Sequence, residues 1–322
     1  MAIVGALLDT MGRWLLHHAP GLARLYALSL SRRPCATPTP RWSFAGEFYL
    51  ERQWLALRRG ALWTHALDNG LDLRLVVPWL DGTQIETMLG TDASLCAYVA
   101  GSFEPNEFAF LARTLRPGMT FIDVGANEGL FTLFAARRVG ATGRVIAAEP
   151  SGRERALLER NIALNGLANT TVVSQALADA PGTAELLIAP RRYGLHNTLG
   201  DFIYQYDGAP APERETVVVE TLDGLQQRLS LARVDVMKID VEGAEVKVLT
   251  GGRALLATSR PILLVEANEE ALGHQGTSTA ALLDLLRALD YQIHIFNERG
   301  LTEPWTEGRP LSANIVAMPT SG

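Results

Sequence analysis

Charged residues that could move a proton follow the pattern of a buried strand in the run VDVMKIDVEGAE. Because side chains alternate along a strand, Lys238 and Asp240 fall on one face, and Glu242 follows in the next turn. Carboxylates there can align a nucleophile and help a hydroxyl lose its proton, so these three are candidate catalytic residues. A lysine in a central strand is costly unless it is paired. We predict that Lys238 meets Glu266 or Glu242, and the alternative to a catalytic lysine is an ion pair that only braces the sheet.

The next predicted strand ends in PILLVEAN, which brings two further oxygen-bearing side chains to the same sheet edge. Glu266 and Asn268 are expected beside Asp240. Two carboxylates and an amide oxygen are hard ligands that suit Mg²⁺. A bound metal would lower the pKa of a substrate hydroxyl. A Mg²⁺ site formed by Asp240, Glu266 and Asn268 is therefore one hypothesis that the sequence allows.

A long segment over residues 191–215 interrupts the strand pattern and is rich in glycine, proline and aromatic residues. Such a segment is typical of a substrate lid or a pocket wall. His196 is the only histidine in it and is a candidate general base. The alternative is a surface or structural histidine.

A glycine turn follows the strand predicted over residues 121–124 and precedes an apolar helix. Gly125 and Gly129 let a ligand approach the backbone at the carboxyl edge of the sheet, where open α/β sheets bind their ligands. The next strand ends at Glu149, twenty residues past Gly129. A carboxylate at that place can accept hydrogen bonds from both hydroxyls of a ribose. The pattern predicts a nucleotide-type site.

The same turn argues against a dinucleotide. A pyrophosphate site would have glycine where Asn127 and Leu130 stand. Asp123, just before the turn, would repel a pyrophosphate and attract a cationic amino-acid tail.

Strands and helices alternate after Met119, which predicts a mostly parallel sheet with helices on both faces. We expect an α/β, Rossmann-like fold with seven strands, whose last hairpin is formed by YQIHIF and ANIVAMP. The expected divisions are residues 1–40 for N-terminal helices and a linker, 41–100 for a small antiparallel β extension, and 101–322 for the main domain. Four tryptophans are expected to form the core of the extension: Trp42, Trp54, Trp63 and Trp79.

The net charge of −6 and a pI near 5.6 argue against nucleic acid as a partner. Cys35 and Cys96 are too few and too isolated for a disulfide framework or a zinc site. The N-terminal apolar run breaks at Asp9, Arg13 and His17, so neither a signal peptide nor a membrane span is expected, and we expect a cytoplasmic protein. The N-terminal helices favour docking or homo-oligomer contacts over peripheral contact with a membrane.

Three runs resemble the FkbM-type methyltransferase family over residues 102–267: GSFEPNEFAFLARTLRPGMTFIDVGANEGLFTLFAA, NIALNG and, most specifically, VDVMKIDVEGAEVKVLTGG. The resemblance implies dependence on S-adenosylmethionine and methylation of a hydroxyl on a small molecule or glycan. It also implies the cofactor-binding positions Glu104, Asp123, Gly125, Ala126, Asn127, Gly129, Glu149, Pro150, Ser151, Ala176, Leu177 and Asp240.

Three alternatives remain. Methylation of a base amino group is disfavoured, because D-V-E-G stands where an Asn- or Asp-Pro-Pro-aromatic motif would be expected. A cofactor-binding scaffold without catalysis, or a partner-binding subunit, would use the N-terminal helices. A dehydrogenase comes last.

Overall fold

The computed structural model describes residues 10–12, 14–15, 18–31, 53–101, 103–202, 212–297 and 299–320. Its centre is an eight-stranded sheet in the order β12-β11-β13-β10-β9-β3-β4-β5. The five neighbouring strands β10, β9, β3, β4 and β5 run parallel. Their bounds are β3 (Thr120–Val124), β4 (Arg144–Ala148), β5 (Thr170–Val173), β9 (Val236–Ile239) and β10 (Ile262–Glu266).

Two of the last strands run opposite to the parallel strands at one side of the sheet. β13 (Asn314–Pro319) is antiparallel to both β10 and β11 (Tyr291–Phe296), so the predicted pairing of YQIHIF with ANIVAMP is confirmed. The predicted count of seven strands is wrong, because β12 (Thr302–Pro304) pairs with β11 as an eighth strand at the edge. Three residues are too few to show the alternation by which a strand is recognised in a sequence.

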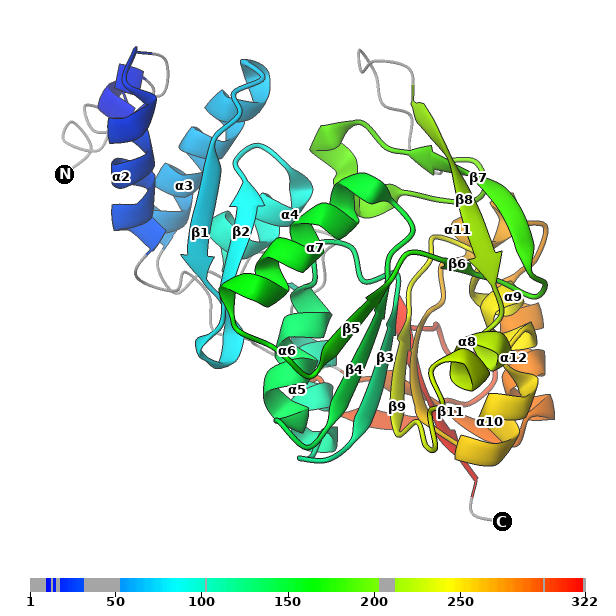
Figure 1. The fold of residues 1–322 in the computed structure, drawn as a ribbon. Helices are drawn as coiled ribbons and strands as arrows, with labels where there is room; N and C mark the ends of the chain where they lie inside the picture. The colour runs from blue at the N-terminus through cyan, green and yellow to red at the C-terminus, as the bar shows by residue number, and fades with distance from the viewer. Residues whose placement is uncertain are drawn as a thin grey trace.

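Helices cover both faces of this sheet, as predicted (Figure 1). Phe121 and Val145 belong to the apolar core shared with α5 (Pro105–Thr114) and α6 (Leu130–Val139), and α7 (Gly152–Leu164) packs on the same side. Ile122 and Ile146 point to the other core. That second core is closed by α8 (Leu222–Arg228), α9 (Glu245–Thr250), α10 (Arg253–Ser259), α11 (Glu269–His274) and α12 (Thr279–Ala288).

The residues before this domain form helices and one strand pair, which lie beside α6 and α7 in Figure 1. The elements are α2 (Pro20–Ser31), α3 (Gln53–Asp68), β1 (Arg74–Pro78), η1 (Leu80–Gly82), β2 (Gln84–Met88), α4 (Asp92–Ser94) and η2 (Leu95–Ala100). The predicted antiparallel unit is present as β1 and β2. The prediction missed α3, whose buried Leu62 and Ala66 lie one helical turn apart.

The four tryptophans of this region have different outcomes. Trp79 is buried and meets the Phe108 ring edge-on, so it belongs to the core. Trp63 is half-buried and donates a hydrogen bond to the Thr91 carbonyl over 2.7 Å. Trp42, the side chain of Trp54 and the linker over residues 32–40 lie outside the described parts of the chain.

A second, three-stranded sheet lies above the carboxyl edge of the central sheet (Figure 1). It contains β6 (Ala176–Leu177), β7 (Gly182–Ile188) and β8 (Glu213–Glu220). The predicted lid segment connects β7 to β8, and its first part is the short helix η3 (Arg191–His196). Within the described ranges, no helix has the length and apolar character needed to cross a membrane.

Candidate functional site

A cavity of about 390 Å³ lies at the carboxyl edge of β3, β4, β9 and β10, under η3. Its volume is in the range of small-molecule sites, roughly 300–1,000 Å³. Most of the predicted site residues line it: Glu104, Gly125, Ala126, Asn127, Glu149, Pro150, Ala176, Leu177, His196, Lys238, Asp240, Glu242, Glu266 and Asn268. Asp123, Gly129 and Ser151 do not line it. The structure thus brings the separately predicted catalytic and cofactor residues together.

The glycine turn fits tightly against the end of β9. Gly125 has a φ of 82°, which favours glycine, and a Cβ there would overlap the backbone oxygen of Asp240. Gly129 begins α6 with a φ of 97°, and a Cβ there would overlap the side chain of Leu158. Glycine is therefore favoured by conformation at both positions, and at Gly125 the Asp240 backbone also leaves no room for a Cβ.

Glu149 is held at the floor of the cavity by backbone hydrogen bonds. Its Oε2 accepts from Asn127 N over 2.8 Å and its Oε1 accepts from Ser151 N over 2.8 Å. Burial, reinforced by Glu154, raises the pKa of Glu149 to about 8. Each carboxylate oxygen has a second lone pair, so the group can still accept hydroxyl hydrogen bonds from a ribose.

Asp123 lies behind the cavity wall. It is fully buried and accepts a hydrogen bond from Thr132 Oγ1 over 2.6 Å. Burial raises its pKa to about 6, against the opposing effect of Lys238. It does not line the cavity, and its buried Oδ1 has no hydrogen-bond partner among the described residues.

Lys238 is paired, as predicted, but with a different partner. Its Nζ donates to Asp240 Oδ2 over 2.8 Å, so the expectation of Glu266 or Glu242 is wrong. The ammonium also lies 4.6 Å from the centre of the Phe131 ring. Burial opposes the charge, but Asp240, Asp123 and Glu104 outweigh it and raise the pKa of Lys238 above its ordinary value.

Glu104 brings an unsatisfied carboxylate oxygen into the cavity. Asn314 Nδ2 donates to its Oε1 over 2.9 Å, and the buried Oε2 has no hydrogen-bond partner among the described residues. Burial, with Glu107 and Asp240, raises the pKa of Glu104 to about 8. A cationic group placed here would satisfy that oxygen and favour the ionised form.

His196 lies between carboxylates from two distant parts of the chain. Its Nδ1 is 3.3 Å from Glu242 Oε1 and its Nε2 is 3.8 Å from Asp92 Oδ2. Burial disfavours the imidazolium, but Glu242 and Asp92 outweigh it and raise the pKa of His196. An imidazole in this setting can take up a proton from a substrate and hold it.

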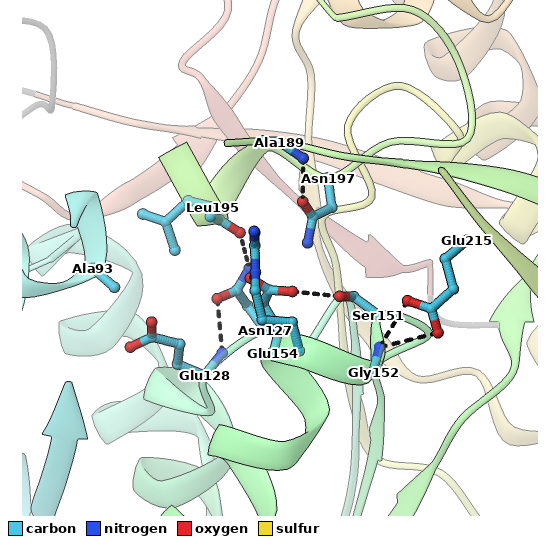
Figure 2. Close-up of polar contacts among 12 residues, drawn as sticks. Ala93, Asn127, Glu128, Ser151, Gly152, Glu154, Ala189, Leu195, Asn197 and Glu215 are labelled. Atoms are coloured by element: carbon cyan, nitrogen blue, oxygen red, sulfur yellow. Dashed lines mark hydrogen bonds and ion pairs between the residues drawn. The ribbon is translucent and has the colours of Figure 1, made fainter. Parts of the chain in front are cut away.

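The segment that carries His196 is tied to the glycine turn. Asn127, in the left-handed conformation with a φ of 49°, donates from Nδ2 to the Gly194 carbonyl over 2.8 Å. Figure 2 shows Asn127 below this segment, close to Glu128 and Leu195. The same figure shows Asn197 accepting from Ala189 N over 2.8 Å, which fixes the segment from its other side.

The residues predicted for Mg²⁺ do not fit that ion as a set. Asn268 Oδ1 accepts from Glu270 N over 3.1 Å and from Ala271 N over 3.3 Å, so it caps α11. In the parts of the chain that the structure describes, no three His, Cys, Asp or Glu side chains form a metal-binding group. Burial, together with Asp240 and Glu242, raises the pKa of Glu266 well above its ordinary value.

Sequence reasoning missed several residues of this site. Asp92 and Asn314 come from elements far away in the chain, and nothing local marked them. Phe131 was predicted only as part of an apolar helix. Glu128 lines the cavity and accepts a hydrogen bond from Thr87 Oγ1 over 3.3 Å, and its place inside the glycine turn could have indicated it.

Residues 123–293, more than half of the chain, match the profile of the Methyltransferase FkbM domain. The AMB antimetabolite synthetase AmbE of Pseudomonas aeruginosa is 31% identical over 214 residues, which is 56% of this chain and 10% of that protein. The 31-O-demethyl-FK506 methyltransferase FkbM of Streptomyces tacrolimicus is 32% identical over 161 residues, 42% of this chain and 60% of that one.

The alignments thus span between 10% and 60% of the length of these curated relatives. Among solved structures, the methyltransferase FkbM of Methylobacillus flagellatus KT is similar with 14% identity and a TM-score of 0.39. That comparison covers 91% of this chain and 58% of the other.

Proposed function

Because this chain belongs to the FkbM methyltransferase family, whose members use S-adenosylmethionine, we propose that it methylates a hydroxyl oxygen of a small molecule or glycan. The observation that carries the proposal is one cavity that contains both a nucleotide-type floor and a proton acceptor. Gly125 and Glu149 form the floor, and His196 with Glu242 forms the proton acceptor. A hydroxyl needs such a base, since its proton must leave as the oxygen bonds to carbon.

The residues of the cavity fit a cationic donor. S-adenosylmethionine carries a sulfonium and an ammonium, and when bound it supplies an electrophilic methyl carbon. Glu149 would accept from the ribose hydroxyls, and the unpartnered Glu104 Oε2 would face the cationic end. Lys238 is the only lysine or arginine among the described residues that line the cavity, and Asp240 already compensates its charge.

Around His196, where the substrate hydroxyl would bind, the protein's own contribution is to align that hydroxyl and to take up its proton. We assign proton acceptance to His196 Nε2, because Nδ1 faces Glu242 at 3.3 Å. With the donor bound, the substrate oxygen would bond to the methyl carbon as the bond from that carbon to sulfur breaks, leaving S-adenosylhomocysteine, and the hydroxyl proton would go to the imidazole. Glu242 and Asp92 then stabilise the imidazolium. Glu242 has a φ of 52°, and backbone strain of this kind is common at functional sites.

Calorimetric titration of the purified chain with S-adenosylmethionine, S-adenosylhomocysteine and NADH tests the donor. We expect the first two to bind, and NADH not to bind. A screen of hydroxylated and amine-bearing acceptors with methyl-labelled donor then tests the acceptor, with mass spectrometry to locate the label. Label only on nitrogen would refute O-methylation. Absence of donor binding would favour the scaffold alternative, and NADH binding the dehydrogenase.

A further inference from the structure

The residues before the central domain reach into the site through one carboxylate. Asp92, at the start of α4, accepts from Ala93 N at Oδ1 over 2.8 Å and from Leu195 N at Oδ2 over 3.2 Å. The same Oδ2 lies 3.8 Å from His196 Nε2. The hydrogen bond to Leu195 joins residues that are 103 positions apart in the chain. The side chain of Asp92 is buried, so this contact is shielded from water.

Asp92 is itself held by a well-connected piece of structure. Thr91 caps α4 through its side chain, and Ser94 Oγ in turn accepts a hydrogen bond from Thr91 N over 3.1 Å. Trp63 of α3 donates from Nε1 to the Thr91 carbonyl over 2.7 Å and to Ser94 Oγ over 3.0 Å. Since every one of these groups is buried or half-buried, the position of Asp92 follows from the packing of α3 against α4.

The segment that Asp92 contacts has several other attachments, and two of them join it to the glycine turn and to the turn after β9. Asn127 donates to the Gly194 carbonyl over 2.8 Å, and Thr198 Oγ1 donates to the Glu242 carbonyl over 3.0 Å. These two bonds hold residues on either side of His196 but do not reach its ring. The ring itself is contacted by Glu242 at Nδ1 and by Asp92 at Nε2. Asp92 is thus the contact that links both the backbone and the ring of this segment to the N-terminal elements.

We propose that Asp92 is a positioning residue for His196, so that the N-terminal extension completes the acceptor side of the site. It fixes the backbone at Leu195 and faces Nε2, the nitrogen to which proton uptake is assigned. The role of His196 in the reaction rests on the proposed function, but the contact with Asp92 does not. Glu242, Asp92 and Asp240 all raise the pKa of His196. Burial raises the pKa of Asp92 to about 6, so its carboxylate is charged above that pH.

The test compares three variants of the full chain. Asp92→Asn removes the charge and keeps an oxygen for one of the two backbone bonds, while Asp92→Ala removes the charge and both bonds. Asp81→Asn is the control, because Asp81 lies in the same extension and pairs with Arg138 at an exposed position. NMR titration of the His196 ring, assigned with His196→Gln, reports its pKa without any ligand. Hydrogen exchange at the Leu195 amide reports the backbone bond.

We expect both Asp92 variants to lower the pKa of His196, and Asp92→Ala to speed exchange at Leu195 by about tenfold or more. Asp81→Asn should change neither. If Asp92→Ala fails to fold, the His196 pKa measured in Asp92→Asn is enough to test the proposal. A His196 pKa in Asp92→Asn equal to that of the wild type would overturn the proposal.

Once the acceptor screen has supplied a substrate, kinetics add a second readout. Asp92→Asn should reduce kcat by about tenfold, with the acid limb of its pH profile moved to lower pH and S-adenosylhomocysteine affinity within about twofold of wild type. An unmoved acid limb would argue against the role. If no hydroxyl is ever methylated, the proposed function fails, and the NMR result still judges the contact between Asp92 and His196.

Discussion

The two halves of the cavity are built in different ways. The donor half, around Gly125, Asn127 and Glu149, is held by backbone hydrogen bonds between two consecutive strand-to-helix turns. The acceptor half is assembled from side chains of Asp92 and His196 and of Glu242, which lie on three separate segments. The difference teaches that the first half depends on backbone conformation, whereas the second depends on how distant segments pack.

The largest effect is expected from a methyl group added to the donor half. Gly125→Ala would overlap the Asp240 carbonyl and must leave a φ of 82°, so the turn has to move. We expect loss of S-adenosylhomocysteine binding by more than about a hundredfold and destabilisation by about 2–4 kcal/mol, measured by calorimetry and thermal unfolding. Gly166→Ala is the matched control, with a φ of 62° and open space around it. It should lower stability by about 1 kcal/mol and leave binding unchanged.

A change in the acceptor half should separate turnover from donor affinity. His196→Gln removes the proton acceptor but leaves the floor of the cavity intact. We expect kcat to fall by about a hundredfold to a thousandfold, with S-adenosylhomocysteine affinity within about twofold of wild type. Steady-state kinetics beside calorimetry would measure this. A parallel loss of both quantities would mean that the two halves are not separable.

Neutralising Glu149 at the floor of the cavity should weaken donor binding and leave turnover unchanged, which is the opposite of the result expected for His196→Gln. Glu149→Gln keeps the shape of the side chain but loses its charge, and its amide nitrogen cannot accept from Asn127 N or Ser151 N. We expect weaker S-adenosylhomocysteine binding by about tenfold to a hundredfold, from roughly 1.5–3 kcal/mol per charge-assisted bond. At saturating donor, kcat should stay near the wild-type value. Unchanged affinity would remove Glu149 from the donor site.

The smallest effect is a pH dependence of the donor half. Burial raises the pKa of Glu104 and of Glu149 from 4.5 to about 8, so both are largely protonated at pH 6 in the ligand-free chain. Because the folded-state values are raised, the free energy of unfolding falls as pH rises from about 4.5 through about 8. A bound cation favours the ionised forms. S-adenosylmethionine affinity should therefore rise by about threefold to tenfold between about pH 6 and pH 9, with proton release in calorimetry.

The donor half could be predicted from the sequence because its residues are neighbours in the chain. Two glycines and an acidic residue at the end of the next strand are a local signal, and the alternation of strands and helices predicts the sheet edge where they meet. The partner of Lys238 was also within reach. Strand alternation puts Asp240 on the same face, and it is this nearer carboxylate that pairs with the lysine.

The acceptor half could not be predicted in the same way. The contact of Asp92 with Leu195 depends on α3 packing against α4, and α3 was not recognised as a helix. Asn314 reaches Glu104 only because β13 inserts between β10 and β11. His196 was selected by residue type, but the carboxylates around it come from tertiary structure. The edge strand β12 was missed because a three-residue strand leaves no readable period.

Asn127 belongs to both halves at once. Its backbone N–H donates to Glu149 Oε2, and its side chain donates to the Gly194 carbonyl. A donor molecule that engages Glu149 therefore acts on the residue that holds the acceptor segment. If the bound methyl donor changes the affinity for the methyl acceptor by some factor, the bound acceptor must change the affinity for the donor by the same factor. We expect this reciprocity to appear as a change of the same factor in the Kd of each ligand when the other is bound.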